Sequence, residues 1–255
     1  MRILAFANQK GGVGKTTTTV NTAVEIAREG KRVLLVDLDP QGNATSSLGI
    51  DKAELENTLH DCLVDGLPID AAVVRNVRPG LDVLPTTASL AAAEVDLVAL
   101  PQRERQLKRA IAAAPTTWDL VLIDCPPSLG LLTVNGLTAA SDVVIPIQCE
   151  FLALEGVSQL ITTIDLVKRQ LNPDLDLIGV LMTMFDARTN LSSSVVEEVR
   201  RFFPDRIFRT VIPRSVRLAE APSYGQAIAE YDPSSRGGLA YREFAQELIE
   251  RLAVQ

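Results

Sequence analysis

The sequence has few of the side chains that build disulfide frameworks, metal clusters and aromatic cores. Its 255 residues include three cysteines, one histidine and only 4% aromatic residues. Cys62, Cys125 and Cys149 lie far apart without a Cys-x-x-Cys pair, and His60 alone cannot complete a zinc site with them. We therefore expect free thiols rather than a disulfide or metal framework.

Long apolar runs and flexible linkers are also absent from the sequence. No run of about 18 apolar residues occurs, so no membrane-spanning helix is predicted. No tract rich in Pro, Gly or Ser divides the chain, which favours a single domain over residues 1–255. Apolar residues make up 47% of the chain and aromatics are scarce, so aliphatic side chains must fill the core. Such a core suits buried parallel strands rich in Val, Ile and Leu.

Short apolar runs alternate with helical patterns along the whole chain. The predicted strands are Ile3–Ala7, Val33–Val36, Leu81–Leu84, Leu120–Ile123, Val143–Pro146, Ile178–Met184 and Thr210–Ile212. A first helix is predicted around Val20–Ala27, ending at Gly30. Further predicted helices are Leu129–Ala140, Glu155–Leu171, Leu191–Phe203 and Leu239–Leu252. This alternation predicts an α/β fold, a mostly parallel twisted sheet with helices on both faces.

A glycine-rich segment between the first predicted strand and the first predicted helix has the pattern of a phosphate-binding loop. It reads Gly11, Gly12, Val13, Gly14, Lys15, Thr16, Thr17. Glycines let phosphate oxygens approach the backbone N–H groups, and the helix N-terminus adds a favourable dipole. Lys15 is expected to neutralise the β- and γ-phosphates, and the Thr16 hydroxyl to ligate Mg²⁺. The segment therefore predicts a P-loop that binds ATP with Mg²⁺.

Lys10 directly precedes the glycines, which departs from the general P-loop pattern. A second cation there exceeds what one phosphate cradle needs. One use is to reach a nucleotide bound to a facing subunit, as an arginine finger does. The alternative is a solvated surface lysine.

Aspartates end two of the predicted strands, where ligands of open α/β sheets bind. Asp124 has the position of a carboxylate that holds Mg²⁺ through water. Asp37 and Asp39 follow another strand, and Asp39 is a candidate to position the attacking water and to contact the metal through water. A helix cap or a turn is the alternative for any one of them. Three such aspartates beside a P-loop favour the ATPase interpretation.

These segments together resemble the ParA/Soj family of partition ATPases, within the deviant-Walker P-loop NTPases that include MinD. The resemblance covers Asn8–Thr17, Val36–Ala44, Ile123–Leu132, Gln148–Gly156, Thr183–Asn190 and Val211–Pro222. It implies a slow, Mg²⁺-dependent ATPase that forms a sandwich homodimer on ATP and binds double-stranded DNA without sequence preference. It further implies that a ParB-type centromere-binding protein stimulates hydrolysis. The expected location is cytoplasmic and nucleoid-associated, without a membrane partner.

The resemblance also assigns roles to individual residues. Lys10, Lys15 and Asp39 would be catalytic, with Lys10 reaching the phosphates of the other subunit. Pro213, Arg214 and Ser215 match a segment that lies against adenine, although the family often has Asn where Ser215 stands. Two further positions match DNA contacts of the family, Arg188 and Arg217.

The charge distribution is compatible with DNA binding at one place. The chain carries a net charge of −7, yet residues 188–217 hold seven arginines against three acids, a net of +4. Arg200 and Arg201 follow Glu197 and Glu198 at helical spacing, so these arginines are expected to form local ion pairs. No such local partner is expected for Arg188 and Arg217, which lie outside the predicted helix. Phosphate neutralisation by arginine is sufficient for non-specific DNA binding.

Three other functions remain open at this point. A MinD-like membrane-associated regulator would need a basic amphipathic C-terminal helix. Residues 239–255 instead contain Arg242 and Arg251 against Glu243, Glu247 and Glu250. An ATP-dependent enzyme acting on a small substrate would need an additional catalytic group, and only an isolated His60 is present. A tyrosine kinase would be expected to have tyrosines clustered near a terminus, whereas the three tyrosines are dispersed.

Overall fold

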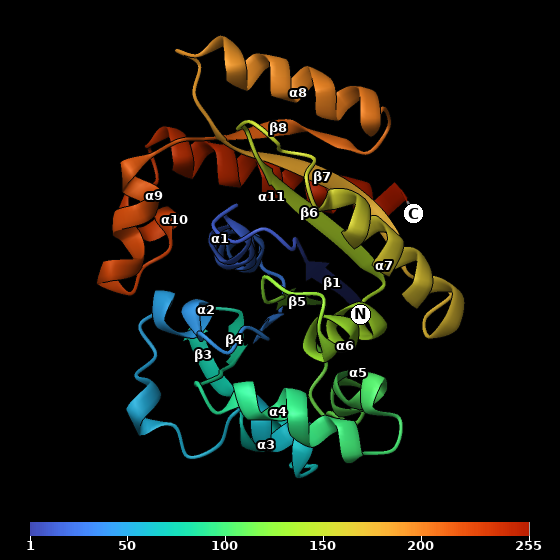
Figure 1. The fold of residues 1–255 in the computed structure, drawn as a ribbon. Coiled ribbons are helices and arrows are strands. Elements are labelled where there is room, and N and C mark those ends of the chain that lie inside the picture. Colours follow the sequence, from blue (N-terminus) through green and yellow to red (C-terminus); the bar gives the residue numbers. More distant parts are fainter. Residues whose placement is uncertain (255) are drawn as a thin grey trace.

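The computed structural model describes residues 1–254, and a twisted eight-stranded sheet runs through its centre (Figure 1). Its spatial order is β3-β4-β2-β5-β1-β6-β7-β8, and every neighbouring pair is parallel except β3 with β4. The strands are β1 (Arg2–Phe6), β2 (Val33–Asp37), β3 (Val74–Arg78), β4 (Leu81–Leu84), β5 (Leu120–Asp124), β6 (Asp142–Gln148), β7 (Asp176–Phe185) and β8 (Ile207–Pro213). The predicted mostly parallel α/β sheet is confirmed.

Helices cover both faces of this sheet (Figure 1). One apolar core packs α1, α2, α10 and α11 against one face, and the other packs α3 to α8 against the opposite face. The helices are α1 (Lys15–Arg28), α2 (Asn43–Ser47), α3 (Leu59–Val64), α4 (Leu90–Asp96), α5 (Gln106–Ala112), α6 (Leu131–Ala139), α7 (Val157–Gln170), α8 (Asn190–Phe202), α9 (Val216–Glu220), α10 (Ile228–Tyr231) and α11 (Arg236–Val254). Over the described residues, no helix is both long and apolar enough to cross a membrane.

The central strands are apolar throughout because both of their faces are buried. Every residue of β2 and of β5 is buried, including the aspartate that ends each strand. An aspartate in such an environment is costly unless it has a partner or a function. The three cysteines are free and buried, as expected.

The predicted strands and helices are present, with boundaries shifted by a few residues. One strand, β3, was not predicted. Its sequence Val-Arg-Asn-Val-Arg breaks the apolar–polar alternation that indicates a strand. At this edge of the sheet Asn76 has a φ of 49°. This edge strand is also the antiparallel one. The short helices α2 to α5, α9 and α10 also lack the long periodic patterns that predicted the others.

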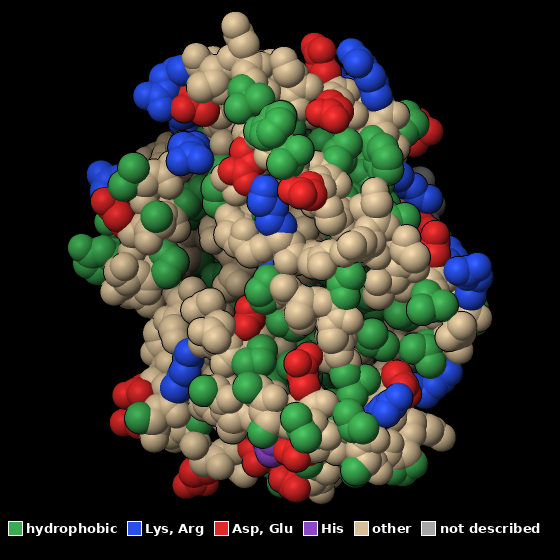
Figure 2. All heavy atoms as spheres, viewed as in Figure 1, with side chains coloured by type: hydrophobic (Ala, Val, Ile, Leu, Met, Phe, Trp, Pro, Cys, Tyr) green, Lys and Arg blue, Asp and Glu red, His purple; other side chains and the backbone are tan. Residues whose placement is uncertain are grey.

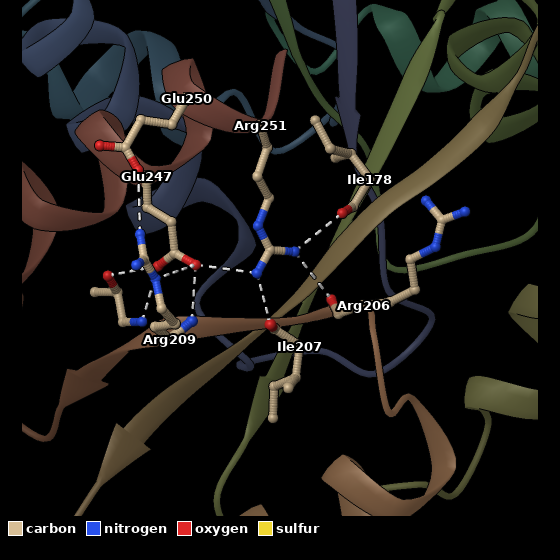
Figure 3. Close-up of polar contacts among 8 residues, drawn as sticks. Ile178, Arg206, Ile207, Arg209, Glu247, Glu250 and Arg251 are labelled. Atoms are coloured by element: carbon tan, nitrogen blue, oxygen red, sulfur yellow. Dashed lines mark hydrogen bonds and ion pairs between the residues drawn. The ribbon is translucent and has the colours of Figure 1, made fainter. Parts of the chain in front are cut away.

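An ion pair on α11, between Glu247 and Arg251, binds the backbone of β8 at the opposite edge of the sheet (Figure 3). Glu247, which is 4% exposed, accepts hydrogen bonds from the backbone N–H groups of Arg209 and Thr210 at 2.8 and 2.9 Å. Arg251 lies 3.0 Å from Glu247 and donates to the carbonyl oxygens of Ile178 and Ile207. The pair therefore satisfies two N–H groups of the edge strand β8 and carbonyl oxygens near the start of β7 and of β8.

Glu247→Ala is expected to lower the free energy of unfolding by about 3 kcal/mol, because it leaves Arg251 without its charge partner and two N–H groups without an acceptor. Urea denaturation would measure the loss. Glu243→Ala, an exposed change on the same helix, is the matched control. Equal midpoints for the two variants would contradict the role of Glu247.

The same interaction predicts a dependence on pH. Burial of Glu247 opposes its ionisation, but hydrogen bonds from Arg209 and Thr210 outweigh burial and lower its pKa. A carboxyl whose pKa is lower in the folded state than in the unfolded state stabilises the fold when it is ionised. This stabilisation is complete at pH values above the unfolded pKa of about 4.3, and it is lost as the pH falls below that value. The stability difference between the wild type and Glu247→Ala should therefore shrink on acidification.

Candidate nucleotide site

The glycine loop joins β1 to α1, with β5 and β6 on either side of β1 (Figure 1). Gly12 and Gly14 have φ values of 75° and 87°, which L side chains rarely adopt. The Thr183 hydroxyl donates to the carbonyl oxygen of Val13 at 2.7 Å and so fixes the loop to β7. A Cβ placed on Gly11 or Gly12 would meet no atom within 4 Å, so the space over the loop is open. The loop is thus shaped to present N–H groups to an anion.

Lys15 places a cation inside the loop. It is 6% exposed, and its Nζ donates to the carbonyl oxygen of Lys10 at 3.2 Å. Burial lowers the pKa of Lys15, while the charges of Asp124 and Asp39 oppose that shift. A buried ammonium with few protein partners is suited to the oxygens of a phosphate group.

Asp37 and Asp124 lie side by side, because β2 and β5 are parallel and these residues are partners in the register. Asp37 accepts hydrogen bonds from the Thr45 backbone and hydroxyl, both at 2.7 Å, and Asp124 accepts one from the Thr19 hydroxyl at 3.2 Å. One carboxylate oxygen of each aspartate is buried without a hydrogen-bond partner among the described residues. Burial raises the pKa of both, and the charges of nearby carboxylates raise it further.

Two adjacent buried carboxylates with unpaired oxygens fit the chemistry of Mg²⁺, which prefers oxygen ligands and retains water. Asp124 has the Thr16 hydroxyl and the Lys15 ammonium as favourable neighbours. Asp37 is held by Thr45 at the start of α2, so it also anchors that helix. Asp39 is 7% exposed and accepts a hydrogen bond from the backbone of Gln41 at 3.0 Å.

A cavity of about 230 Å³ adjoins the loop at Gly14 and Thr17. The three residues predicted from the adenine segment line it, namely Pro213, Arg214 and Ser215. Its other walls were not predicted; they are Thr183, Met184, Ile212, Leu218, Ala219 and Tyr241. Tyr241 comes from α11, and its hydroxyl lies 3.2 Å from that of Thr18. A mostly apolar cavity next to a phosphate loop is suited to a nucleotide base.

Lys10 lies at the start of the loop, with its side chain half-exposed. Its Nζ is 2.6 Å from a carboxylate oxygen of Glu150, and the two side chains are 35% and 39% exposed. Sequence reasoning did not predict this partner, because Glu150 follows β6, far along the chain. Lys10 is therefore neither buried with Lys15 nor simply solvated.

The expectation that Arg188 and Arg217 lack local partners is wrong. Arg188 donates to both oxygens of Asp186, at 2.9 and 2.7 Å. Arg217 lies 3.0 Å from Glu220 and 3.5 Å from Asp232. The turn after β7 brings Asp186 to Arg188, and one turn of α9 brings Glu220 to Arg217. Both arginines remain exposed.

The expected ion pairs of the preceding helix are found in part. Arg201 lies 4.0 Å from Glu197, at the i,i+4 spacing of α8. Arg200 has no ion pair among the described residues. Two further arginines of the basic stretch pair with distant acids, Arg206 with Asp176 and Arg209 with Glu250.

These features define a P-loop ATPase: a glycine loop with a buried lysine, paired acids at neighbouring strand ends, and a base-sized cavity. A family model described as an AAA domain matches residues 1–177. The chain is 56% identical over 247 residues to the sporulation initiation inhibitor protein Soj of Bacillus subtilis, covering 97% of this chain and 98% of that protein. It is 48% identical to the chromosome partitioning protein ParA of Caulobacter vibrioides, covering 98% and 95%.

A crystal structure of a protein named cobyrinic acid a,c-diamide synthase, from Mycobacterium smegmatis with bound ADP and magnesium, superposes with a TM-score of 0.87 at 44% identity. The superposition covers 99% of this chain and 96% of that one. The chain belongs to the ParA/Soj family of chromosome-partitioning ATPases. It is an ATPase whose cofactors are ATP and Mg²⁺.

Proposed function

We propose that this ATPase is a DNA-partition switch. Two copies face each other on ATP, the homodimer binds double-stranded DNA without sequence preference, and a ParB-type partner stimulates the hydrolysis that ends binding. The observation that carries the proposal is the position of Lys10. Because Lys15 already supplies the buried counter-charge, the half-exposed Lys10 can serve a facing subunit once it leaves the half-exposed carboxylate of Glu150.

Within one subunit, the loop N–H groups and Lys15 would bind the phosphates, and the cavity beside Gly14 would take the base. Thr16 and Asp124 would hold Mg²⁺, the aspartate through water, with Asp39 as a further contact through water. The metal, when bound, supplies neutralisation of phosphate charge. Asp39 would orient the attacking water from the end of β2.

Arg188 and Arg217 would contact DNA phosphates from the exposed loops that follow β7 and β8. Both arginines pair with carboxylates in this structure, so DNA phosphates must compete with those carboxylates. Such binding depends strongly on salt and carries no sequence information. A cytoplasmic, nucleoid-associated location would follow from it.

Binding of double-stranded DNA, measured with ATP, ADP and no nucleotide, tests this proposal. We expect binding with ATP alone, and we expect Arg188→Glu or Arg217→Glu to weaken it about tenfold or more while ATP-dependent dimerisation persists. Arg201→Glu, at an ion-paired position on α8, is the control. Binding that does not depend on the nucleotide, or no binding at all, would contradict the switch.

Two other functions are separated by further assays. A MinD-like regulator predicts ATP-dependent pelleting with anionic liposomes. The apolar residues of α11 that such a helix would bury in lipid, including Phe244 and Leu248, are instead packed in the core. The name of the M. smegmatis protein suggests a small-substrate synthase as the second candidate. ATP turnover that requires a corrinoid acid and an amide donor would favour it.

A further inference from the structure

The ends of β7 and β8 bring three arginines onto one surface. Phe185 and Pro213 are register partners, and the backbone N–H of Arg214 donates to the carbonyl oxygen of Phe185 at 2.9 Å. The residues that follow these partners, Asp186 and Arg214, are therefore close together. Arg188 reaches the same Asp186. Figure 2 shows basic side chains, with acidic ones between them, gathered at the upper left over the start of α8 and over α9.

Arg214 differs from the other two arginines in its pairing. Arg188 is bound to Asp186, and Arg217 to Glu220 and Asp232. Arg214 is exposed and forms no ion pair among the residues that the structure describes. Arg214 nevertheless acts electrostatically on Asp186. Hydrogen bonds from Arg188 lower the pKa of the Asp186 carboxyl, and the charge of Arg214 lowers it further by a smaller amount.

The local backbone separates the Arg214 side chain from the residues on either side of it. Ser215 is extended, with φ −145° and ψ 128°, and Pro213 ends β8. Successive side chains of an extended chain point to opposite sides. Pro213 and Ser215 are half-buried, whereas Arg214 is exposed. All three residues line the base cavity, but only Arg214 is exposed, so part of its side chain lies on the arginine surface outside the cavity.

We infer that Arg214 is a third DNA-backbone contact, and that its guanidinium binds a phosphate between those bound by Arg188 and Arg217. The inference rests on the proposed function and adds a DNA contact to a side chain that also lines the base cavity. A phosphate at Arg214 displaces no carboxylate, whereas one at Arg188 or Arg217 must. Arg214 therefore contributes more to DNA affinity than either neighbour.

The test compares Arg214→Ala with Arg200→Ala. Arg200 also lies in the basic stretch and is exposed without an ion pair among the described residues, but it sits near the far end of α8. Fluorescence anisotropy of a labelled random-sequence duplex, with a non-hydrolysable ATP analogue and at several salt concentrations, would measure affinity. For Arg214→Ala we expect about tenfold weaker binding and a salt slope lower by about two, because each of the two subunits in the dimer neutralises one phosphate fewer. Arg200→Ala should bind as the wild type does.

A second measurement distinguishes DNA binding by Arg214 from base binding. Because Arg214 also lines the base cavity, affinity for a fluorescent ATP analogue is measured in the same variant, and DNA binding is compared with both proteins saturated by the nucleotide. The loss of DNA affinity should persist at saturation. Wild-type DNA affinity in Arg214→Ala at saturating nucleotide would overturn the inference and leave the proposed function standing. Failure of the wild type itself to bind DNA in any nucleotide state would overturn both.

Discussion

Lys15→Ala should bind ATP at least about 100-fold more weakly than the wild type and should show no hydrolysis. Its ammonium is the buried cation of the loop, and removing one partner of a buried charge interaction costs about 3–5 kcal/mol. Titration of a fluorescent ATP analogue would measure the affinity, and phosphate release the turnover.

Lys10→Ala is the informative control for that experiment, because it removes the other lysine of the same loop. Lys10 is half-exposed and pairs with Glu150, so its loss should leave the ATP affinity of a single subunit intact. Hydrolysis that depends on dimerisation should decline in this variant. If Lys15→Ala binds ATP normally, Lys15 does not supply the phosphate counter-charge.

Asp39→Ala should bind ATP and form the dimer, yet hydrolyse ATP about 100-fold or more slowly, since positioned acid–base groups contribute about 10²–10⁴-fold. The residue follows β2 and is almost fully buried beside Lys15. Light scattering would follow dimer formation, and phosphate release would follow turnover in the same preparation.

Asp39 also has a structural role in the turn that follows β2, and a second variant separates this role from chemistry. Its Oδ1 accepts a hydrogen bond from the backbone of Gln41, so Asp39→Ala loosens that turn as well. Asp39→Asn retains an acceptor for Gln41 but removes the carboxylate charge. Equal loss of hydrolysis in both variants would identify the charge as the important feature, while normal turnover in Asp39→Asn would exclude the Asp39 carboxylate from the mechanism.

The sequence predicted which residues lie together at the centre of the candidate site, because their placement follows from local rules. Parallel strands end at one edge of a sheet, so aspartates after two apolar runs were expected near the P-loop, and Asp37 and Asp124 are indeed register partners. The glycines and Lys15 form one short segment whose geometry depends on few distant residues.

Interactions between distant parts of the chain could not be predicted in this way. Glu150 meets Lys10 only after β6 is placed beside β1, and Tyr241 reaches the base cavity only after α11 packs on α1. The partners of Arg188 and Arg217 are close in sequence, yet they depend on a turn and on a short helix whose signals are weak. Tertiary packing decides these details.

Under the proposed function, the Lys10–Glu150 ion pair would oppose self-association of the free subunit. In the proposed dimer, Lys10 must leave Glu150 before it can reach the opposite nucleotide. A pair of this exposure is worth about 0.2–1 kcal/mol, and a symmetric dimer breaks two, so the dissociation constant rises by at most about 30-fold. That penalty is small beside the gain from phosphate binding, so it suppresses chance encounters between empty subunits without preventing assembly once ATP is bound.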